Sequence, residues 1–310
     1  MAVTNLPPTN YIRTSTDELD RIRSRYTKRS KWTVTTVIQR VLFWALIVFI
    51  VLYTLFPFYW AIVSSLTPDV DLYVYPVKYW PQNVTLEHYE AVFENGGFMR
   101  ALLNSAIVSF GTVILALFFG TLAAYAMGRL QFRGRTPVLY LILSMTMFPA
   151  IAIVGSLYTF MQRFELYNTL HGLIIVYLTF SLPFIVWVLT NFFRAMPAEL
   201  EQAALVDGAT PLRALWQVLL PMAIPGLVTT GLLAFISAWS EFLYALSFTI
   251  NEDARTVQVA ISQFTGNTQF ELPFAKKMAA AVVVTVPLLV GVLFVQRRII
   301  SGLTAGAVKG

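Results

Sequence analysis

The stretch PAELEQAALVDGATPLRALWQVLLP, residues 197–221, decides how this chain is organised. It is a polar segment between two long apolar ones. A short helix is predicted over 198–206, because Pro197 suits the start of a helix and strong helix formers follow it. Gly208 can take the left-handed backbone conformation that ends a helix. Thr210 then offers a hydroxyl cap, and Pro211 stands at the first position of a second helix.

Small side chains mark one face of the first predicted helix. Ala203 and Ala204 leave that face without bulk, so another protein could approach it closely. A polar helix–turn–helix between apolar segments therefore predicts a docking element for a partner. The alternative is an ordinary helical loop.

The composition predicts an all-α integral membrane protein. The 310 residues are 57% hydrophobic and only 12% charged, whereas soluble domains carry about 25% charged residues. The formal charge of +6 could suggest a nucleic-acid partner. However, much of the excess lies between Arg13 and Arg40, where eight basic residues face three acidic ones just before the first apolar run. This pattern is typical of a cytoplasmic membrane flank, so we expect no nucleic acid.

Six apolar runs approach or exceed the length needed to cross about 30 Å of hydrocarbon as helices. Only the fifth contains a charge, Glu241. Prolines within these runs suggest bent helices around a cavity or kinked packing alone, among them Pro149, Pro183, Pro225 and Pro287. The predicted spans are residues 41–66, 104–128, 137–161, 171–193, 218–247 and 278–296.

The loops between the spans indicate the orientation. The loop after the second span carries Arg129, Arg133 and Arg135, and the segment after the fourth span starts with Arg194 and contains Arg213, whereas residues 67–99 hold five acids against one lysine. Because basic residues mark the cytoplasmic side, we expect both termini to be cytoplasmic. The acidic loop also carries aromatic side chains that could form an interfacial belt or meet an external partner: Tyr73, Tyr75, Tyr79 and Trp80.

Sequence patterns for catalysis are absent. The chain contains no GxxxxGK[ST] loop to hold phosphates, no HExxH and no GxSxG. His88 and His171 are the only histidines, too few for a histidine-based metal site, and there is no cysteine. We therefore expect no catalytic residue, no metal and no cofactor in this chain, and we can assemble no catalytic set for an intramembrane enzyme.

One carboxylate is predicted deep in an apolar span. Helical spacing places Ser237, Glu241 and Tyr244 on one face, with Ser240 at its flank. An intramembrane carboxylate by default faces a wet cavity or a paired group. This face could offer hydrogen bonds to a hydroxylated solute, or Glu241 could make a structural bond between helices. A further alternative is an ion-coupled carrier or channel that uses Glu241 as a proton or cation site.

Residues Gln202-Ala203-Ala204, Gly208 and Val218-Leu219-Leu220-Pro221 have a recognisable spacing. It resembles the cytoplasmic loop of binding-protein-dependent ABC importer permeases, which reads EAA, three residues, Gly, about nine residues, Ile, one residue and Leu-Pro. Gln202 stands where the family has a glutamate that is thought to contact the ATPase. A glutamine can still donate and accept hydrogen bonds.

Two further stretches resemble one branch of that family. Trp239-Ser240-Glu241-Phe242 is similar to the Trp-Asn-Glu-Phe signature of carbohydrate permeases, with Ser240 in place of Asn. Residues 296–310 resemble the C-terminus of the maltose- and trehalose-type permeases. The resemblance covers roughly residues 41–310. It implies the type I ABC importer transmembrane fold with six transmembrane helices, the last five forming the transporter core.

The resemblance also implies a function and a set of partners. The chain would form half of the translocation pathway of an ATP-driven importer in the bacterial inner membrane, for a di- or oligosaccharide or a similar glucoside. Its partners would be a second homologous permease, two cytoplasmic ATPase subunits that bind ATP and Mg, and an external sugar-binding protein. The permease domain would cover 41–300, flanked by tails 1–40 and 301–310, and its coupling helix would lie at 198–215.

Two groups of site residues follow from the resemblance and from the position of Glu241. The residues expected to couple to the ATPase are Glu201, Gln202, Ala203, Ala204, Asp207 and Gly208. The residues expected along the translocation path are Ser237, Ser240, Glu241 and Tyr244.

Overall fold

The computed structural model of the chain describes residues 34–265 and 273–307. All regular secondary structure within these residues is helical, as predicted. The predicted basic tail 1–40 falls mostly outside the described residues, which begin with helix α2 at Val34. The chain divides into two compact units, residues 1–58 and 59–310.

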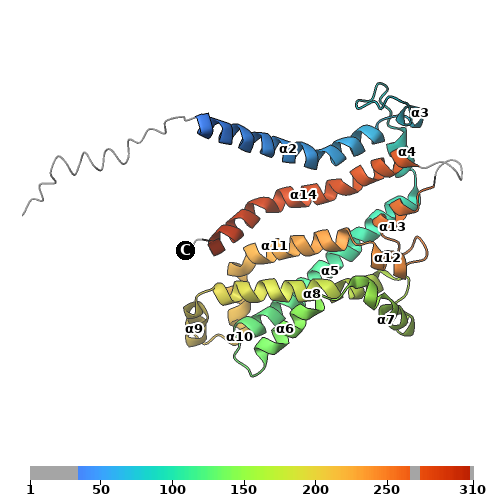
Figure 1. The fold of residues 1–310 in the computed structure, drawn as a ribbon. Helices are drawn as coiled ribbons and strands as arrows, with labels where there is room; N and C mark the ends of the chain where they lie inside the picture. Colours follow the sequence, from blue (N-terminus) through green and yellow to red (C-terminus); the bar gives the residue numbers. More distant parts are fainter. Residues whose placement is uncertain (1–33, 266–272, 308–310) are drawn as a thin grey trace, which may run out of the picture. The chain divides into compact units, whose positions relative to one another are not determined.

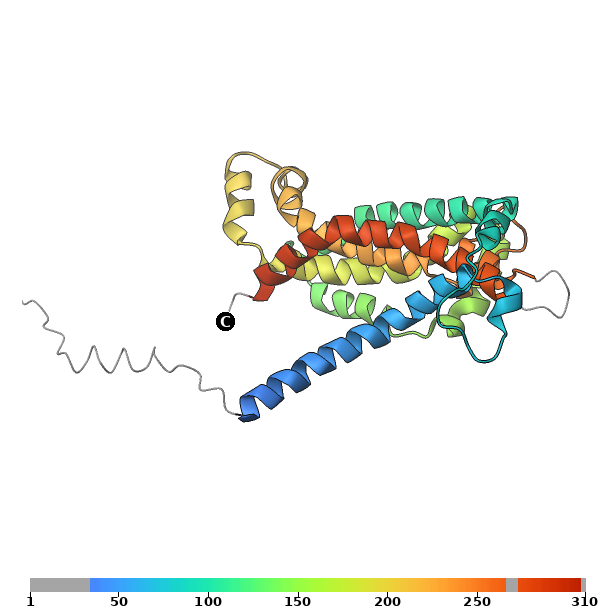
Figure 2. The same cartoon turned by 90° about the horizontal axis from the view of Figure 1, so that it is seen from above.

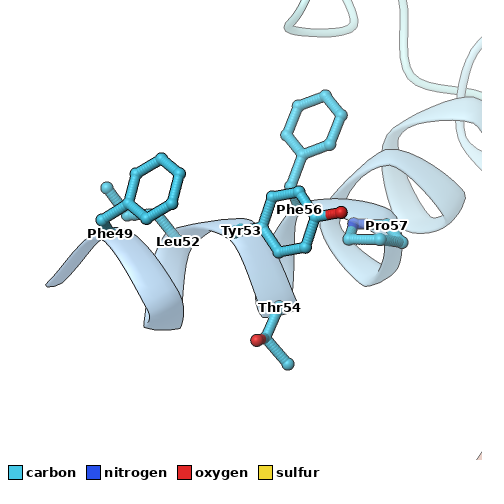
Figure 3. A pocket seen from close by; sticks show the side chains of 6 residues that line it. All are labelled: Phe49, Leu52, Tyr53, Thr54, Phe56 and Pro57. Atoms are coloured by element: carbon cyan, nitrogen blue, oxygen red, sulfur yellow. The ribbon is translucent and has the colours of Figure 1, made fainter. Parts of the chain in front are cut away.

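Helix α2 (Val34–Ser65) corresponds to the first predicted span. Its large apolar side chains, among them Phe49 and Tyr53, are exposed, as expected for a helix that faces lipid. Figure 3 shows the side chains that line a depression on this helix beside Pro57. All of them come from α2 itself, so the depression is a feature of the surface of one helix.

The predicted number of spans is confirmed when one bent helix pair is counted as a span. Within the described residues, five helices are long and apolar enough to cross a membrane, and the bent pair makes a sixth. The five are α2, α5 (Gly96–Gly128), α8 (Leu170–Ala195), a helix that starts with α10 and ends with α11, and α14 (Phe274–Ala307). The helix through α11 comprises α10 (Pro211–Ala214), the π-turn η1 (Leu215–Leu219) and α11 (Leu220–Trp239).

The third span differs from the prediction of one helix over 137–161. It consists of α6 (Arg135–Met145) and α7 (Ala150–Arg163), which meet at an angle of 95°. Pro149 caps the start of α7 with extended backbone angles. A proline has no N–H and disfavours helical geometry in the residue before it, which explains the break. Pro183, Pro225 and Pro287 lie inside α8, α11 and α14.

The fifth span also differs from the prediction, which placed one helix over 218–247. Helix α11 ends at Trp239, and a separate short helix, α12 (Leu243–Phe248), follows. Glu241 therefore lies between two helices rather than on the face of one. The hydrogen bonds of its side chain, described below, account for the break.

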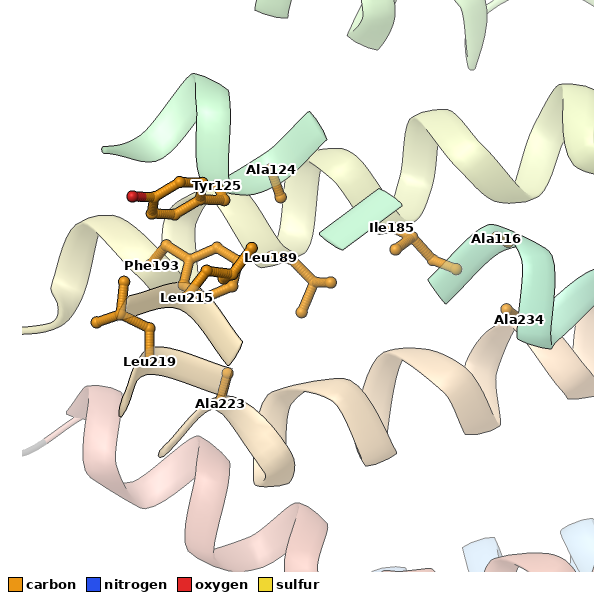
Figure 4. Packing of buried hydrophobic residues seen from close by; sticks show 10 residues of the cluster. All are labelled: Ala116, Ala124, Tyr125, Ile185, Leu189, Phe193, Leu215, Leu219, Ala223 and Ala234. Atoms are coloured by element: carbon orange, nitrogen blue, oxygen red, sulfur yellow. The ribbon is translucent and has the colours of Figure 1, made fainter. Parts of the chain in front are cut away.

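The second unit is a bundle built around α5 and α8. Figure 4 shows the largest buried cluster, to which α5, α8, η1 and α11 all contribute. Gly120 on α5 allows close approach, because a Cβ atom there would lie 2.5 Å from Cγ2 of Ile185 on α8. Small residues serve this purpose at helix contacts in membranes.

The short helices gather at the two ends of this unit. Helix α9 (Ala198–Val206) and α10 lie at one end, and α4 (Glu87–Phe93), α12 and α13 (Val257–Ser262) lie at the other (Figure 1). Helix α3 (Asp69–Leu72) precedes α4. The C-terminal part of α14 reaches the end that carries α9 in both views (Figures 1 and 2). The helix runs to Ala307, so it includes most of the predicted tail 301–310.

Candidate functional site

The helix–turn–helix predicted over 198–215 is present. Helix α9 starts directly after Pro197, and Gly208 follows it with a φ angle of +83°. The Thr210 hydroxyl accepts a hydrogen bond from the backbone N–H of Arg213 at 3.3 Å, and Pro211 opens α10. Figure 2 shows that α9 runs across the direction of the bundle helices at its end. The start of α9, its end and the start of α10 therefore lie where the sequence predicted them.

Glu201 points inward and joins α9 to the end of α5. The Tyr125 hydroxyl donates to Glu201 Oε1 at 2.6 Å, and Arg129 Nε lies 3.6 Å from Oε2, an ion-pair distance. The side chains of Arg129 and Glu201 are only 8% and 14% exposed. We call these three residues the α5–α9 clamp. Because the charges are largely screened from water, their attraction is stronger than that of a surface pair.

The clamp also holds the chain on both sides of α9. The Arg129 guanidinium donates to the carbonyls of Met196 at 3.0 Å and Pro197 at 3.2 Å. The Tyr125 hydroxyl lies 3.3 Å from the carbonyl of Pro211. The chain is therefore bonded to the end of α5 both just before α9 and after the turn that follows it.

The other predicted coupling residues lie on the accessible side. Gln202, Ala203, Asp207 and Gly208 are exposed, and Ala204 is half-buried. A groove of about 600 Å³ lies between α9 and the start of the next span. Of the predicted set, Ala203, Ala204 and Asp207 line the groove. The methyl side chains leave it open, as expected for a surface that another chain approaches.

Glu241 organises the break between α11 and α12. Its carboxylate accepts hydrogen bonds from the backbone N–H groups of Tyr244 at 2.7 Å and Ala245 at 3.0 Å, and from the Tyr177 hydroxyl at 2.7 Å. The carboxylate thus takes the place of the carbonyls that would continue a helix, and it caps the start of α12. Local capping explains why the predicted continuous span ends early.

A cavity of about 250 Å³ opens beside this carboxylate, and we call it the Glu241 cavity. Ser237, Glu241 and Tyr244 all line it, so the structure brings together three of the four predicted path residues. Ser240 caps α11, is exposed, and is not part of the lining. The rest of the lining comes from the α6–α7 break, α7 and α8: Met145, Thr146, Phe148, Ala150, Ile153, Thr179 and Phe180.

The opposite end of α5 holds the segment that follows α12. The Asn104 side-chain amide donates to the carbonyls of Glu252, Asp253 and Arg255, at 2.9–3.2 Å. Ser105 Oγ accepts from the N–H of Val257 at 2.8 Å. One continuous helix is therefore anchored to a loop at each end, to 196–211 at one and to 252–257 at the other.

The sequence did not indicate the structural roles of several residues in the clamp and at the α11–α12 break. Arg129 indicated only the membrane orientation, and the sequence pattern did not point to Tyr125, Tyr177 or Asn104. Their partners lie 76, 64 and about 150 residues away, beyond any local pattern. As for metals, the described residues contain no group of three or more His, Cys, Asp or Glu that could hold an ion.

Comparison with known proteins identifies the family of this chain. Residues 116–304 match the family described as "binding-protein-dependent transport system inner membrane component". The chain belongs to this family. It is therefore a permease of the ABC transporters and an inner membrane protein, as the resemblance implied.

Three known proteins illustrate the similarity. The trehalose transport system permease protein SugB of Mycobacterium tuberculosis is 43% identical, over 88% of this chain and 99% of that protein. The trehalose/maltose transport system permease protein MalG of Thermococcus litoralis is 37% identical, over 88% of this chain and 98% of that protein. A bacterial ABC transporter for alginate import aligns over 86% of this chain and 98% of its own with a TM-score of 0.75 at 23% identity. The predicted importer fold is thereby confirmed.

Proposed function

We propose that this chain is one of two permease subunits of an ATP-driven sugar importer and that its partners drive it through α9. The observation that carries the proposal is the α5–α9 clamp. It fixes the family's loop rigidly to the bundle and leaves Ala203 and Asp207 accessible in a groove. The relatives named for trehalose and maltose support a carbohydrate as the cargo.

The proposal includes four kinds of partner. A second, homologous permease completes the pathway, two ATPase subunits bind ATP and Mg, and an external sugar-binding protein delivers the cargo. This chain contributes no phosphate-binding loop, so the energy comes from the ATPases. The accessible residues Gln202, Ala203 and Asp207 contact the ATPase, whereas Glu201 acts from within the chain by holding α9 to α5.

The clamp suggests how force reaches the membrane helices. When the ATPases close on ATP, α9 moves with them as a rigid body. Tyr125 and Arg129 transmit that motion to α5, which also holds residues 252–257 at its other end through Asn104. The two ends of the pathway then move together, because one helix carries both anchors.

The ion-coupled alternative fits the site less well. A proton or cation carrier needs a carboxylate that binds and releases its ion. Glu241 is already engaged by three donors, two of them backbone N–H groups that do not depend on an ion. Membership in a family of ABC transporter permeases also disfavours an ion-coupled carrier.

Gly208 provides the test of coupling. A Cβ atom there would meet nothing within 4 Å, but its φ of +83° strains a β-branched residue by about 1–3 kcal/mol. We expect Gly208→Val to keep the chain in the membrane and ATP hydrolysis active while sugar uptake by the reconstituted complex is lost. The separate variant Gly208→Asn should import sugar like the wild type, because asparagine tolerates this left-handed backbone conformation.

Gly134 is the matched control. It has a φ of +91°, also has open space around it, and lies in the turn between α5 and α6. Gly134→Val introduces the same strain outside the helix–turn–helix and should leave the number of sugars imported per ATP unchanged. Normal uptake by Gly208→Val would contradict the proposal.

A further inference from the structure

The Glu241 cavity lies where three irregular features of the fold meet. These are the 95° bend between α6 and α7, the break between α11 and α12, and the part of α8 just before Pro183. A membrane helix interrupts its hydrogen bonding only where protein or a water-filled cavity satisfies the backbone. The convergence of these irregular segments around one small space points to a binding site for a polar molecule.

Hydrogen-bond acceptors dominate the lining. The hydroxyls of Thr146, Thr179 and Ser237 each donate to a carbonyl of their own helix or turn, at 2.6–3.0 Å, so they offer only lone pairs to a ligand. Glu241 Oε1 accepts one bond among the described residues, from the Tyr244 N–H. Pro183 has no N–H, so the Thr179 carbonyl also lacks its usual helical donor.

The remaining lining is apolar except for one hydroxyl, and three of its side chains are aromatic. Phe148 and Phe180 contribute apolar rings, and the Tyr244 ring lies parallel to that of Phe180, at 6.3 Å and 12°. The Tyr244 side chain is buried, and its hydroxyl has no hydrogen-bond partner within the described part of the chain. The cavity thus combines several acceptors, one donor and apolar rings.

These groups match a sugar ring better than a cation. A pyranose presents many hydroxyl donors around its edge and C–H groups on its faces. A bound metal ion would require several ligating acids, and Glu241 is the one acid in the lining. Pockets that enclose drug-sized ligands measure roughly 300–1,000 Å³, so a cavity of about 250 Å³ suits a single ring.

We propose that the Glu241 cavity is a subsite of this subunit that holds one ring of the carbohydrate as it crosses the membrane. Thr179, Ser237 and Glu241 accept hydrogen bonds from ring hydroxyls, Tyr244 donates one, and Phe180 covers an apolar face. The inference rests on the proposed function, because it requires a sugar as cargo.

The absence of cysteine in this chain permits a direct test. Ser237→Cys places a thiol in the cavity, and Ser247→Cys places one on α12 outside the lining. In the wild-type chain both serines donate to a carbonyl four residues earlier. The assembled complex is trapped with vanadate and treated with a small thiol reagent, with and without sugar. Mass spectrometry of this chain then follows the modification rate.

The probe is whichever of trehalose, maltose or sucrose the wild-type complex imports. We expect that sugar to slow modification of Ser237→Cys at least fivefold and to leave Ser247→Cys unaffected. Equal rates with and without sugar would overturn the subsite and leave the proposed function intact. If the wild-type complex imports none of the three in an ATP-dependent manner, the proposed function fails and the subsite with it.

Transport kinetics provide an independent measurement. Thr179→Val removes one acceptor from the cavity, whereas Thr285→Val removes a hydroxyl that bonds within α14, away from the lining. Loss of one hydrogen bond should raise the KM for uptake about 3- to 10-fold in Thr179→Val. The uptake kinetics of Thr285→Val should match those of the wild type. An unchanged KM in Thr179→Val would count against the subsite.

Discussion

Glu201 and Glu241 are both half-buried carboxylates that accept a hydrogen bond from a tyrosine hydroxyl, yet they differ in the rest of their contacts. Glu201 pairs with Arg129, and its partners all lie on a different helix. Among the described residues, Glu241 has no cation as a partner, and it accepts two bonds from the backbone N–H groups three and four residues after it. The first carboxylate therefore ties two elements together, whereas the second shapes its own segment and borders a cavity.

This difference teaches that the role of a buried carboxylate depends on where its donors lie in the chain. Bonds to distant helices transmit motion, so Glu201 suits the coupling end. Bonds to neighbouring N–H groups fix local geometry, so Glu241 suits the wall of a binding site. The predictions below test this distinction, from the largest expected effect to the smallest.

The largest loss of stability is expected at Glu241. Glu241→Ala leaves the Tyr177 hydroxyl and two backbone N–H groups without their acceptor, and it should lower the free energy of unfolding by roughly 2–4 kcal/mol. Glu201→Ala should cost about half as much, because it removes one hydrogen bond and one ion pair. Thermal unfolding of the purified complex measures both. Equal losses would remove the distinction.

The two tyrosines separate coupling from stability. Tyr125→Phe removes the hydrogen bond to Glu201 from the α5–α9 clamp. We expect ATP hydrolysis to continue while the number of sugars imported per ATP falls several-fold. Tyr177→Phe removes the matching bond to Glu241 and should lower stability without changing that ratio. An unchanged ratio in Tyr125→Phe would show that the clamp does not transmit force.

The smallest effect concerns Asp71 in α3, a partly buried carboxylate outside the membrane spans. The Asn83 amide, at 3.2 Å, and the Lys78 ammonium, at 3.3 Å, lower the pKa of Asp71 below its usual value. Its contribution to the stability of this loop is therefore full above the unfolded pKa of about 3.9 and is lost as the pH falls through the folded pKa.

Asn83→Ala should raise the pKa of Asp71 toward its usual value and leave transport unchanged. Titration of the labelled Asp71 carboxyl by NMR follows the shift. The same midpoint in both proteins would show that the amide has no influence.

Local signals in the sequence predicted much of the fold. Pro197, Gly208, Thr210 and Pro211 act within a few residues, so the helix–turn–helix followed from them directly. The apolar runs likewise predicted the spans, because the length of a helix in lipid depends only on composition.

Local sequence patterns could not predict the breaks in the third and fifth spans or the α5–α9 clamp, for physical reasons. Proline in a membrane span can bend or end a helix, and tertiary packing selected the break at Pro149 but not at Pro183. Spacing alone placed Glu241 on a helix face, whereas its side chain competes with the backbone and ends that helix. The partners of Tyr125 and Tyr177 become neighbours only when α5, α8 and α11 pack together.

Site-directed photocross-linking from α9 tests the central claim most directly. Ala203→Cys, the sole cysteine of the chain, is labelled with a benzophenone maleimide in the assembled complex, and Val84→Cys in the loop before α4 serves as the exposed control. We expect an adduct between Ala203→Cys and the ATPase subunit that depends on the nucleotide, and none from Val84→Cys. Absence of any ATPase adduct from Ala203→Cys, or its labelling by a reagent confined to the outside, would contradict the account.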